Sequence, residues 1–405
     1  MRVNADAVDK GGYMLATRIL LVLIAMATAL AASPAAAQLS GQTVVIGVAG
    51  PMTGGASALG VEQKQGVEVA VDERNAAGGI LGAPVVLVAA DDRADAAEGK
   101  AVAQRFCDDP RVLGVVGHVN SGVSIEASKV YNACRLPMLT AMSSSPGVTD
   151  RGLDNVFRLT NRDDNKGPAI AGYLYRTLGK RRAVVVDDQT TYGRGLSDLF
   201  AQAFVKAGGE VVKRLTVTVG QKEFQATVAD FPAAFDLVFF AGIAEAAPLL
   251  KEIRTRGLQQ RFACGDGCWD VKGFIGRAEG AATQGEGVLV LSATPSIGRV
   301  LGSTEFAARY QAKYGPIANY AVNSYDSARL VLLAIETAAK AKGAMPTRDE
   351  VVAALRASRF QGIAYAGPVG WDAKGDNTSA VIMLNVVEGD HFKEIGEVTR
   401  EELAR

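Results

Sequence analysis

The sequence has little histidine, few aromatic residues and no excess of charge of either sign. Of its 405 residues only two are histidines, His118 and His391, and 6% are aromatic. Lysine plus arginine and aspartate plus glutamate both number 43, so the formal net charge is zero. Without a basic excess the chain has no bulk attraction for nucleic acid or for an anionic membrane. The scarcity of histidine also argues against a histidine-rich metal site.

Familiar enzyme motifs are missing as well. The loop after the first predicted strand, Gly47–Gly55, contains neither G-x-G-x-x-G nor a phosphate-binding P-loop. No G-x-S-x-G marks a hydrolase nucleophile. His118 could serve Ser121 as a base, but the sequence shows no acidic partner, so we expect His118 to be structural and His391 to lie on the surface. We therefore expect no catalytic residue, cofactor or metal, although a triad assembled in space stays an alternative.

The N-terminal segment has the pattern of a secretory signal peptide. Arg18 precedes an apolar run over 19–30, and the small residues of 33–37 lead into Gln38. We predict that residues 1–37 form a signal peptide with an upstream extension, cleaved after Ala37. The apolar run is short for a membrane span, which needs about 20 residues. The pattern therefore predicts export.

All four cysteines follow the predicted cleavage point. An oxidising compartment favours disulfides, and four cysteines allow three pairings. The favoured pairs are Cys107–Cys134 and Cys264–Cys268, because each is local; a zinc site is the alternative, with spacings that do not match a pair of C-x₂-C motifs.

Short β-branched runs alternate with helical periodicity along the chain. Strands are predicted at 43–48, 84–88, 112–116, 137–139, 183–186, 211–219, 237–240 and 287–291. Helices are predicted between and after them, at 62–77, 94–107, 124–133, 196–207, 246–256, 305–313 and 324–340. Two blocks of this alternation indicate an α/β fold of two doubly wound lobes with parallel sheets. Ligands of such folds bind beyond the carboxyl ends of the strands.

Several of those strand ends carry recognisable stretches. They read VIGVAGPMTG (45–54), NAAGGI (75–80), AADD (89–92), GHVNSG (117–122), DQTTYGRG (188–195), GQKEF (220–224) and GWDAKGD (370–376). In this order the chain resembles the periplasmic leucine/isoleucine/valine-binding proteins of ATP-binding-cassette importers, over about residues 42–385. The resemblance implies a type I periplasmic binding fold, with a three-crossover hinge between a first lobe (41–161 plus 291–369) and a second lobe (162–290 plus 370–405).

The resemblance also implies a ligand site in the cleft between the lobes. Its eight positions in this chain are Leu59, Ser121, Met142, Ser144, Tyr192, Ile243, Asp266 and Tyr320. Ser121 and Ser144 would hold a ligand carboxylate near a helix N-terminus. Asp266 and the Met142 carbonyl would receive an ammonium group. Tyr192 would close over the ligand and Tyr320 would form an aromatic wall, whereas Tyr325 is expected in the core.

Two of these positions depart from the family pattern. Leu59 and Ile243 stand where relatives often carry aromatic rings, so the side-chain preference is open. The resemblance implies a periplasmic, monomeric binding protein that delivers a branched-chain or other apolar amino acid to a membrane permease. The alternatives are a receptor for an aromatic or short-chain acid or amide, a ligand sensor that feeds a signalling receptor, and a secreted enzyme.

Overall fold

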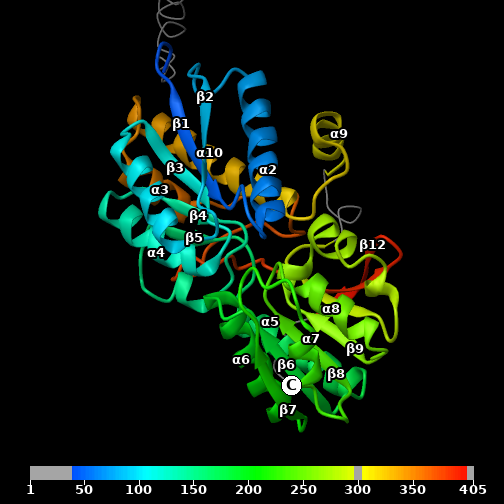
Figure 1. The fold of residues 1–405 in the computed structure, drawn as a ribbon. Coiled ribbons are helices and arrows are strands. Elements are labelled where there is room, and N and C mark those ends of the chain that lie inside the picture. The colour runs from blue at the N-terminus through cyan, green and yellow to red at the C-terminus, as the bar shows by residue number, and fades with distance from the viewer. Residues whose placement is uncertain (1–38, 296–302, 399–405) are drawn as a thin grey trace, which may run out of the picture.

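A computed structural model describes residues 39–295 and 303–398. The predicted signal peptide, residues 1–37, lies outside the described residues. Two separate β-sheets organise the rest, one at the centre of each lobe (Figure 1). No helix in 39–295 or 303–398 is long and apolar enough to cross a membrane.

The first lobe is built on a five-stranded parallel sheet in the order β2-β1-β3-β4-β5. The strands are β1 (Val44–Gly50), β2 (Val85–Asp91), β3 (Val112–Gly117), β4 (Met138–Thr140) and β5 (Val156–Arg158). Alternate residues of β1 face opposite sides, as the two-residue period of a strand requires. Val44, Ile46 and Val48 join one core cluster, and Val45 and Ala49 join another.

Helices cover both faces of this sheet. The pair α2 (Ser57–Ala76) and α10 (Ala321–Lys342) covers one face, and the pair α3 (Ala96–Asp108) and α4 (Ser121–Ala133) covers the other (Figure 1). The lobe is completed by the single turn η1 (Pro146–Val148), α9 (Ser303–Tyr314) and α11 (Arg348–Ala357). Tyr325 lies in the core beneath α2, as expected.

The second lobe has a seven-stranded sheet in the order β12-β11-β10-β9-β8-β6-β7. Its strands are β6 (Arg182–Asp187), β7 (Glu210–Thr216), β8 (Leu237–Ala241), β9 (Arg261–Cys264), β10 (Val288–Ser292), β11 (Met383–Glu388) and β12 (His391–Glu397). Its helices and helical turns are α5 (Asp163–Gly172), η2 (Tyr173–Thr177), α6 (Thr191–Lys206), α7 (Gln225–Ala229), α8 (Ala246–Thr255), η3 (Asp266–Cys268), η4 (Val271–Gly276) and η5 (Ala281–Thr283).

This second sheet is not wholly parallel, which corrects the expectation. β11 pairs antiparallel with both β10 and β12. An antiparallel strand at the edge of a parallel sheet is common in large α/β folds. The two-residue turn between β11 and β12 suits this arrangement, because antiparallel neighbours need no crossover helix.

The chain passes between the lobes three times among its described elements: from β5 to α5, from β10 to α9, and from α11 to β11. The packing at the third passage differs from the expected boundary after residue 369. Trp371 lies in the first-lobe core, 5.1 Å from the Phe157 ring between centroids. Asp376 also bonds to Arg158 of β5. The segment over 370–376 therefore packs on the first lobe before the chain enters β11.

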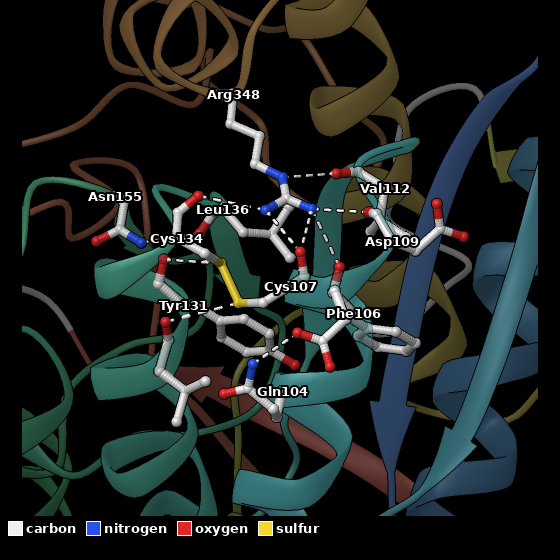
Figure 2. Close-up of a disulfide and its surroundings, with 12 residues drawn as sticks. Gln104, Phe106, Cys107, Asp109, Val112, Tyr131, Cys134, Leu136, Asn155 and Arg348 are labelled. Carbon is white, nitrogen blue, oxygen red and sulfur yellow. Dashed lines mark hydrogen bonds between the residues drawn. A yellow bond between two sulfur atoms is a disulfide. The ribbon is translucent and has the colours of Figure 1, made fainter.

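Both cysteine pairs form disulfides, Cys107–Cys134 and Cys264–Cys268, with Cα–Cα distances of 5.8 and 6.3 Å. The first joins the C-terminal ends of α3 and α4 (Figure 2). Arg348, the first residue of α11, donates to carbonyl oxygens around this bridge, including those of Cys107 and Cys134. A cation at two helix C-termini is favourable, because their last carbonyls lack partners within the helix.

Candidate functional site

An inner cavity lies between the lobes at the carboxyl ends of the strands. It is narrow, with a water-accessible volume of about 30 Å³. The structure brings all eight positions predicted from the resemblance to its walls: Leu59, Ser121, Met142, Ser144, Tyr192, Ile243, Asp266 and Tyr320. Val119, Asn120 and Gly267, which were not singled out, complete the lining. The cavity is thus shared by both lobes, as a ligand trapped by closure requires.

A helix N-terminus borders this space. α4 begins at Ser121 rather than near Ser124 as expected, and Asn120 is its N-cap residue with no side-chain cap bond. The Ser121 hydroxyl accepts from the Ser145 amide at 3.2 Å. The first N–H groups of a helix have no partner within the helix, and the helix dipole favours an anion there. The first-lobe side of the cavity can therefore hold a carboxylate, with Ser144 as a second hydroxyl on its wall.

Opposite the serines, the Asp266 carboxylate already has three protein donors. The Tyr192 hydroxyl donates to Oδ1 at 2.9 Å and accepts from the Gly267 amide at 3.0 Å. The Tyr320 hydroxyl lies 3.1 Å from Oδ2 and 3.0 Å from the Asp266 backbone carbonyl, so these two acceptors share its one proton. The third donor is Lys166, whose Nζ lies 2.5 Å from Oδ2. Burial is the main cause that raises the pKa of both tyrosines well above 10, so the hydroxyls stay protonated and act as donors.

Lys166 and its neighbour Asp163 are the polar residues that sequence reasoning missed. Both belong to the start of α5, directly after the first crossover, and both are fully buried. The Asp163 carboxylate lies 3.9 Å from Lys166 Nζ. Neither carboxylate oxygen of Asp163 has a hydrogen-bond partner among the described residues. The nearby Ser144 hydroxyl still acts to lower the pKa of Asp163, because it stabilises the charged carboxylate. Burial raises the pKa of Asp163 to about 7.

Aliphatic side chains form the apolar walls. Leu59 comes from α2, and Ile243 follows β8 in the other lobe. Ile243 also borders a larger outer cleft with a water-accessible volume of about 570 Å³, which shares Asn120, Ser121 and Tyr192 with the inner cavity. The inner cavity and the outer cleft therefore adjoin at these residues.

Several contacts show that the two lobes are closed on each other. The Asn319 side-chain amide of the first lobe donates to the Trp269 carbonyl of the second at 2.9 Å. The Trp269 and Tyr320 rings meet edge to face with centroids 5.2 Å apart. A Cβ added at Gly55 would lie only 3.0 Å from Ala244 Cβ across the cleft. The site is therefore described in its closed arrangement.

His118 is held by buried partners and does not contact Ser121. Its Nδ1 lies 2.6 Å from Asp92 Oδ2, and its Nε2 lies 3.1 Å from the Tyr131 hydroxyl. An acidic partner therefore exists, contrary to the sequence expectation. All three side chains are fully buried, which fits a structural network beneath the cleft rather than a base that meets a substrate.

Metal-ligating groups do not gather in the part of the chain that the structure describes. No cluster of three or more histidine, cysteine, aspartate or glutamate side chains there could hold a metal ion. The polar groups of the inner cavity can bind and orient a small molecule through hydroxyls, free amides and one carboxylate.

Two doubly wound lobes that close over a small polar cavity define a solute-binding protein. The sequence profile of the periplasmic binding protein family matches residues 43–390, and the chain belongs to that family. Among its relatives, an amino acid binding protein of Pseudomonas aeruginosa is 34% identical over 338 residues, 82% of this chain and 87% of the relative. A Leu/Ile/Val-binding protein homolog of Brucella abortus is 30% identical and covers 86% of this chain and 92% of its own length.

A solved structure supports the same family. The leucine-binding protein LivK of Thermotoga maritima superposes with a TM-score of 0.79 at 29% identity. The match covers 89% of this chain and all of that one. The two-lobed α/β fold expected from the sequence is therefore confirmed.

Proposed function

We propose that this chain captures a small solute, made of a carboxylate and an apolar body, and delivers it to an ATP-binding-cassette importer. The observation that carries this proposal is the pairing of the α4 N-terminus with apolar walls in one cavity between the lobes. Leu59, Met142 and Ile243 would contact the apolar body. Ser121 and Ser144 would contact the carboxylate.

The relatives support the transport role. Two carry names that state amino acid or Leu/Ile/Val binding, and the family implies an extracytoplasmic location. An apolar amino acid is accordingly the ligand that the sequence predicts. An acid without an ammonium group is the second candidate, because Lys166 already provides a cation beside Asp266.

A thermal-shift screen of the protein starting at Gln38 tests the binding role. Amino acids, small carboxylic acids and uncharged amides would be added one at a time. A ligand specific to the folded state stabilises it by about 2.7 kcal/mol at a hundredfold excess over Kd. At least one carboxylate should raise the melting temperature; a shift caused by uncharged amides alone would contradict the proposal.

The transport role needs its own experiment, since a sensor would bind ligand equally well. The permease and ATPase from neighbouring genes would be reconstituted in vesicles, with the labelled ligand on the side of the binding protein. Uptake should require this chain and ATP. Binding without uptake would favour the signalling alternative.

A further inference from the structure

The cavity contains a cation of its own, and this bears on the charge of the ligand. A binding site for amino acids must balance its buried acid with the ligand's ammonium group, because an unpaired buried carboxylate is costly. In this chain the acid is Asp266, and it is balanced without any ligand. Lys166, fully buried, supplies the positive charge.

We propose that Lys166 is the built-in counter-cation of Asp266 and that the cavity consequently binds a carboxylic acid without an ammonium group. This inference rests on the proposed function and narrows its substrate class. Two of the donors around Asp266, Lys166 from α5 and Tyr192 from α6, belong to the same lobe as Asp266, and the third, Tyr320 at the start of α10, comes from the other lobe. They leave little accepting capacity on the carboxylate for a ligand ammonium group.

An ammonium group next to Asp266 would also face the Lys166 cation at short range. Two cations that share one carboxylate repel each other in a site shielded from water. A carboxylate ligand meets no such repulsion. It lies against the α4 N-terminus and the serines, while Lys166 shields it from the charge of Asp266.

Ionisation of Asp163 would add a negative charge to the cluster and so favour a second cation there. Asp163 is faced by Lys166 on its own helix, by Asp266 after β9, by Arg158 of β5 and by Tyr192 of α6. It does not line the cavity, and it reaches the ligand site only through Ser144 and Lys166. When Asp163 is protonated, Lys166 and Asp266 form a neutral pair that suits an anionic ligand. When it ionises, the cluster carries one excess negative charge, which disfavours an anion.

The geometry therefore also predicts how affinity varies with pH. The pKa of Asp163 is raised to about 7, mainly by burial, so Asp163 loses its proton as pH rises through that value. Affinity for an ammonium-free acid should then fall between about pH 6 and about pH 8. The substitution D163N removes the ionising group, so it should abolish this fall while the affinity near pH 6 stays.

Matched pairs of probes test the proposal by isothermal titration calorimetry. Leucine is compared with 4-methylpentanoate, and phenylalanine with 3-phenylpropanoate, because each pair differs only in the ammonium group. The wild-type protein should bind at least one ammonium-free acid about tenfold or more tightly than its amino acid partner. The substitution K166Q, which leaves Asp266 without its cation, should reverse that preference.

The outcomes separate this inference from the proposed function. If an amino acid binds more tightly than its ammonium-free partner in the wild type, the inference is wrong and the proposed function stands. If no carboxylate of either kind binds, both are wrong. If circular dichroism shows that K166Q does not fold, the pH dependence of ligand affinity in the wild type and in D163N is the test. An affinity that is independent of pH in both proteins overturns the charge argument.

Discussion

At the scale of single residues, a buried ion pair helps to position one wall of the cavity. Arg158 of β5 is fully buried, and its guanidinium donates to Asp376 Oδ1 at 2.8 Å, to the Ser145 carbonyl at 2.6 Å and to the Thr149 hydroxyl at 2.6 Å. These bonds tie the segment after α11 to the loop that carries Ser144. A residue outside the cavity thus positions one wall of it.

Replacing Arg158 should therefore destabilise the fold. Arg158→Met removes one cation and leaves Asp376 with Arg162 at 2.9 Å and the Thr149 hydroxyl, at a cost of about 3–5 kcal/mol. Chemical denaturation would measure the loss. Arg111→Met is the control, since Arg111 forms only an exposed pair with Asp109 and should leave the midpoint unchanged. Equal effects of the two substitutions would refute this account of Arg158.

Individual residues also show where sequence reasoning stops. The cavity residues were predictable because a strand end in a doubly wound fold points into the cleft. Lys166 was not, because it lies in the polar stretch Arg162–Lys166, which has the composition of a solvated turn. Its burial arises from the first crossover, where the Asp163 amide donates to the Ser144 carbonyl of the other lobe. Composition carries no signal of that tertiary contact.

At the scale of elements, the first lobe depends on the close approach of α2 and α10. A Cβ added at Gly66 would lie 2.2 Å from the Ala321 carbonyl oxygen, which is backbone and cannot turn aside. The glycine therefore allows the start of α10, with Tyr320 just before it, to reach the cavity. The predicted strands and helices are all found, with ends shifted by up to about five residues. The sequence did not predict β5, β9, β11, β12, α5, α7 or α11; β5 is only three residues long and contains Arg158.

Gly66→Ala should force α2 and α10 apart and cost about 1–3 kcal/mol. Gly195→Ala in α6 is the matched control, because nothing lies within 4 Å of the added Cβ. Since alanine favours a helix over glycine, that control should stabilise the protein by up to about 1 kcal/mol. Thermal unfolding of both variants measures these changes in stability. A Gly66→Ala protein as stable as the wild type would contradict the packing argument.

The disulfide between α3 and α4 is a second element-scale feature (Figure 2). Cys107 and Cys134 are separated by 27 residues, so breaking the link enlarges the unfolded ensemble and should cost roughly 2–4 kcal/mol. The double substitution of both cysteines by serine tests this by calorimetry. Ligand affinity should not change, because the bridge lies at the ends of the helices away from Ser121. A large loss of affinity would mean that the bridge shapes the site.

At the scale of the whole molecule, closure brings acidic groups of both lobes together. Glu62 of α2 is buried, and burial raises its pKa to about 8, with Asp270 of the second lobe as a further cause. The pKa of Asp270 is itself raised by burial. The closed protein therefore holds protons that the unfolded chain releases at lower pH.

Because the folded state binds protons that the unfolded chain releases, it is more stable in weak acid than in weak base. Since the folded pKa of Glu62 is above its ordinary 4.5, its contribution is complete below that value and is lost as pH rises toward about 8. Asp163 acts in the same direction up to about 7. The melting temperature should fall from about pH 5.5 to about pH 8.5, and Glu62→Gln should flatten the fall. Glu98 provides the control: Glu98→Gln removes a half-exposed carboxylate of the same lobe and should change the fall less than Glu62→Gln does.

The central claim is that a ligand carboxylate is bound between the lobes at the start of α4. Calorimetric titration of wild type, Ser121→Ala and Ser128→Ala with the best ligand of the screen tests it most directly. Both serines belong to α4, but only Ser121 lines the cavity, while Ser128 lies two turns further along the helix and accepts from Arg151. One ligand should bind per chain, with affinity reduced by about tenfold in Ser121→Ala and unchanged in Ser128→Ala. Equal affinity in all three proteins would contradict the claim.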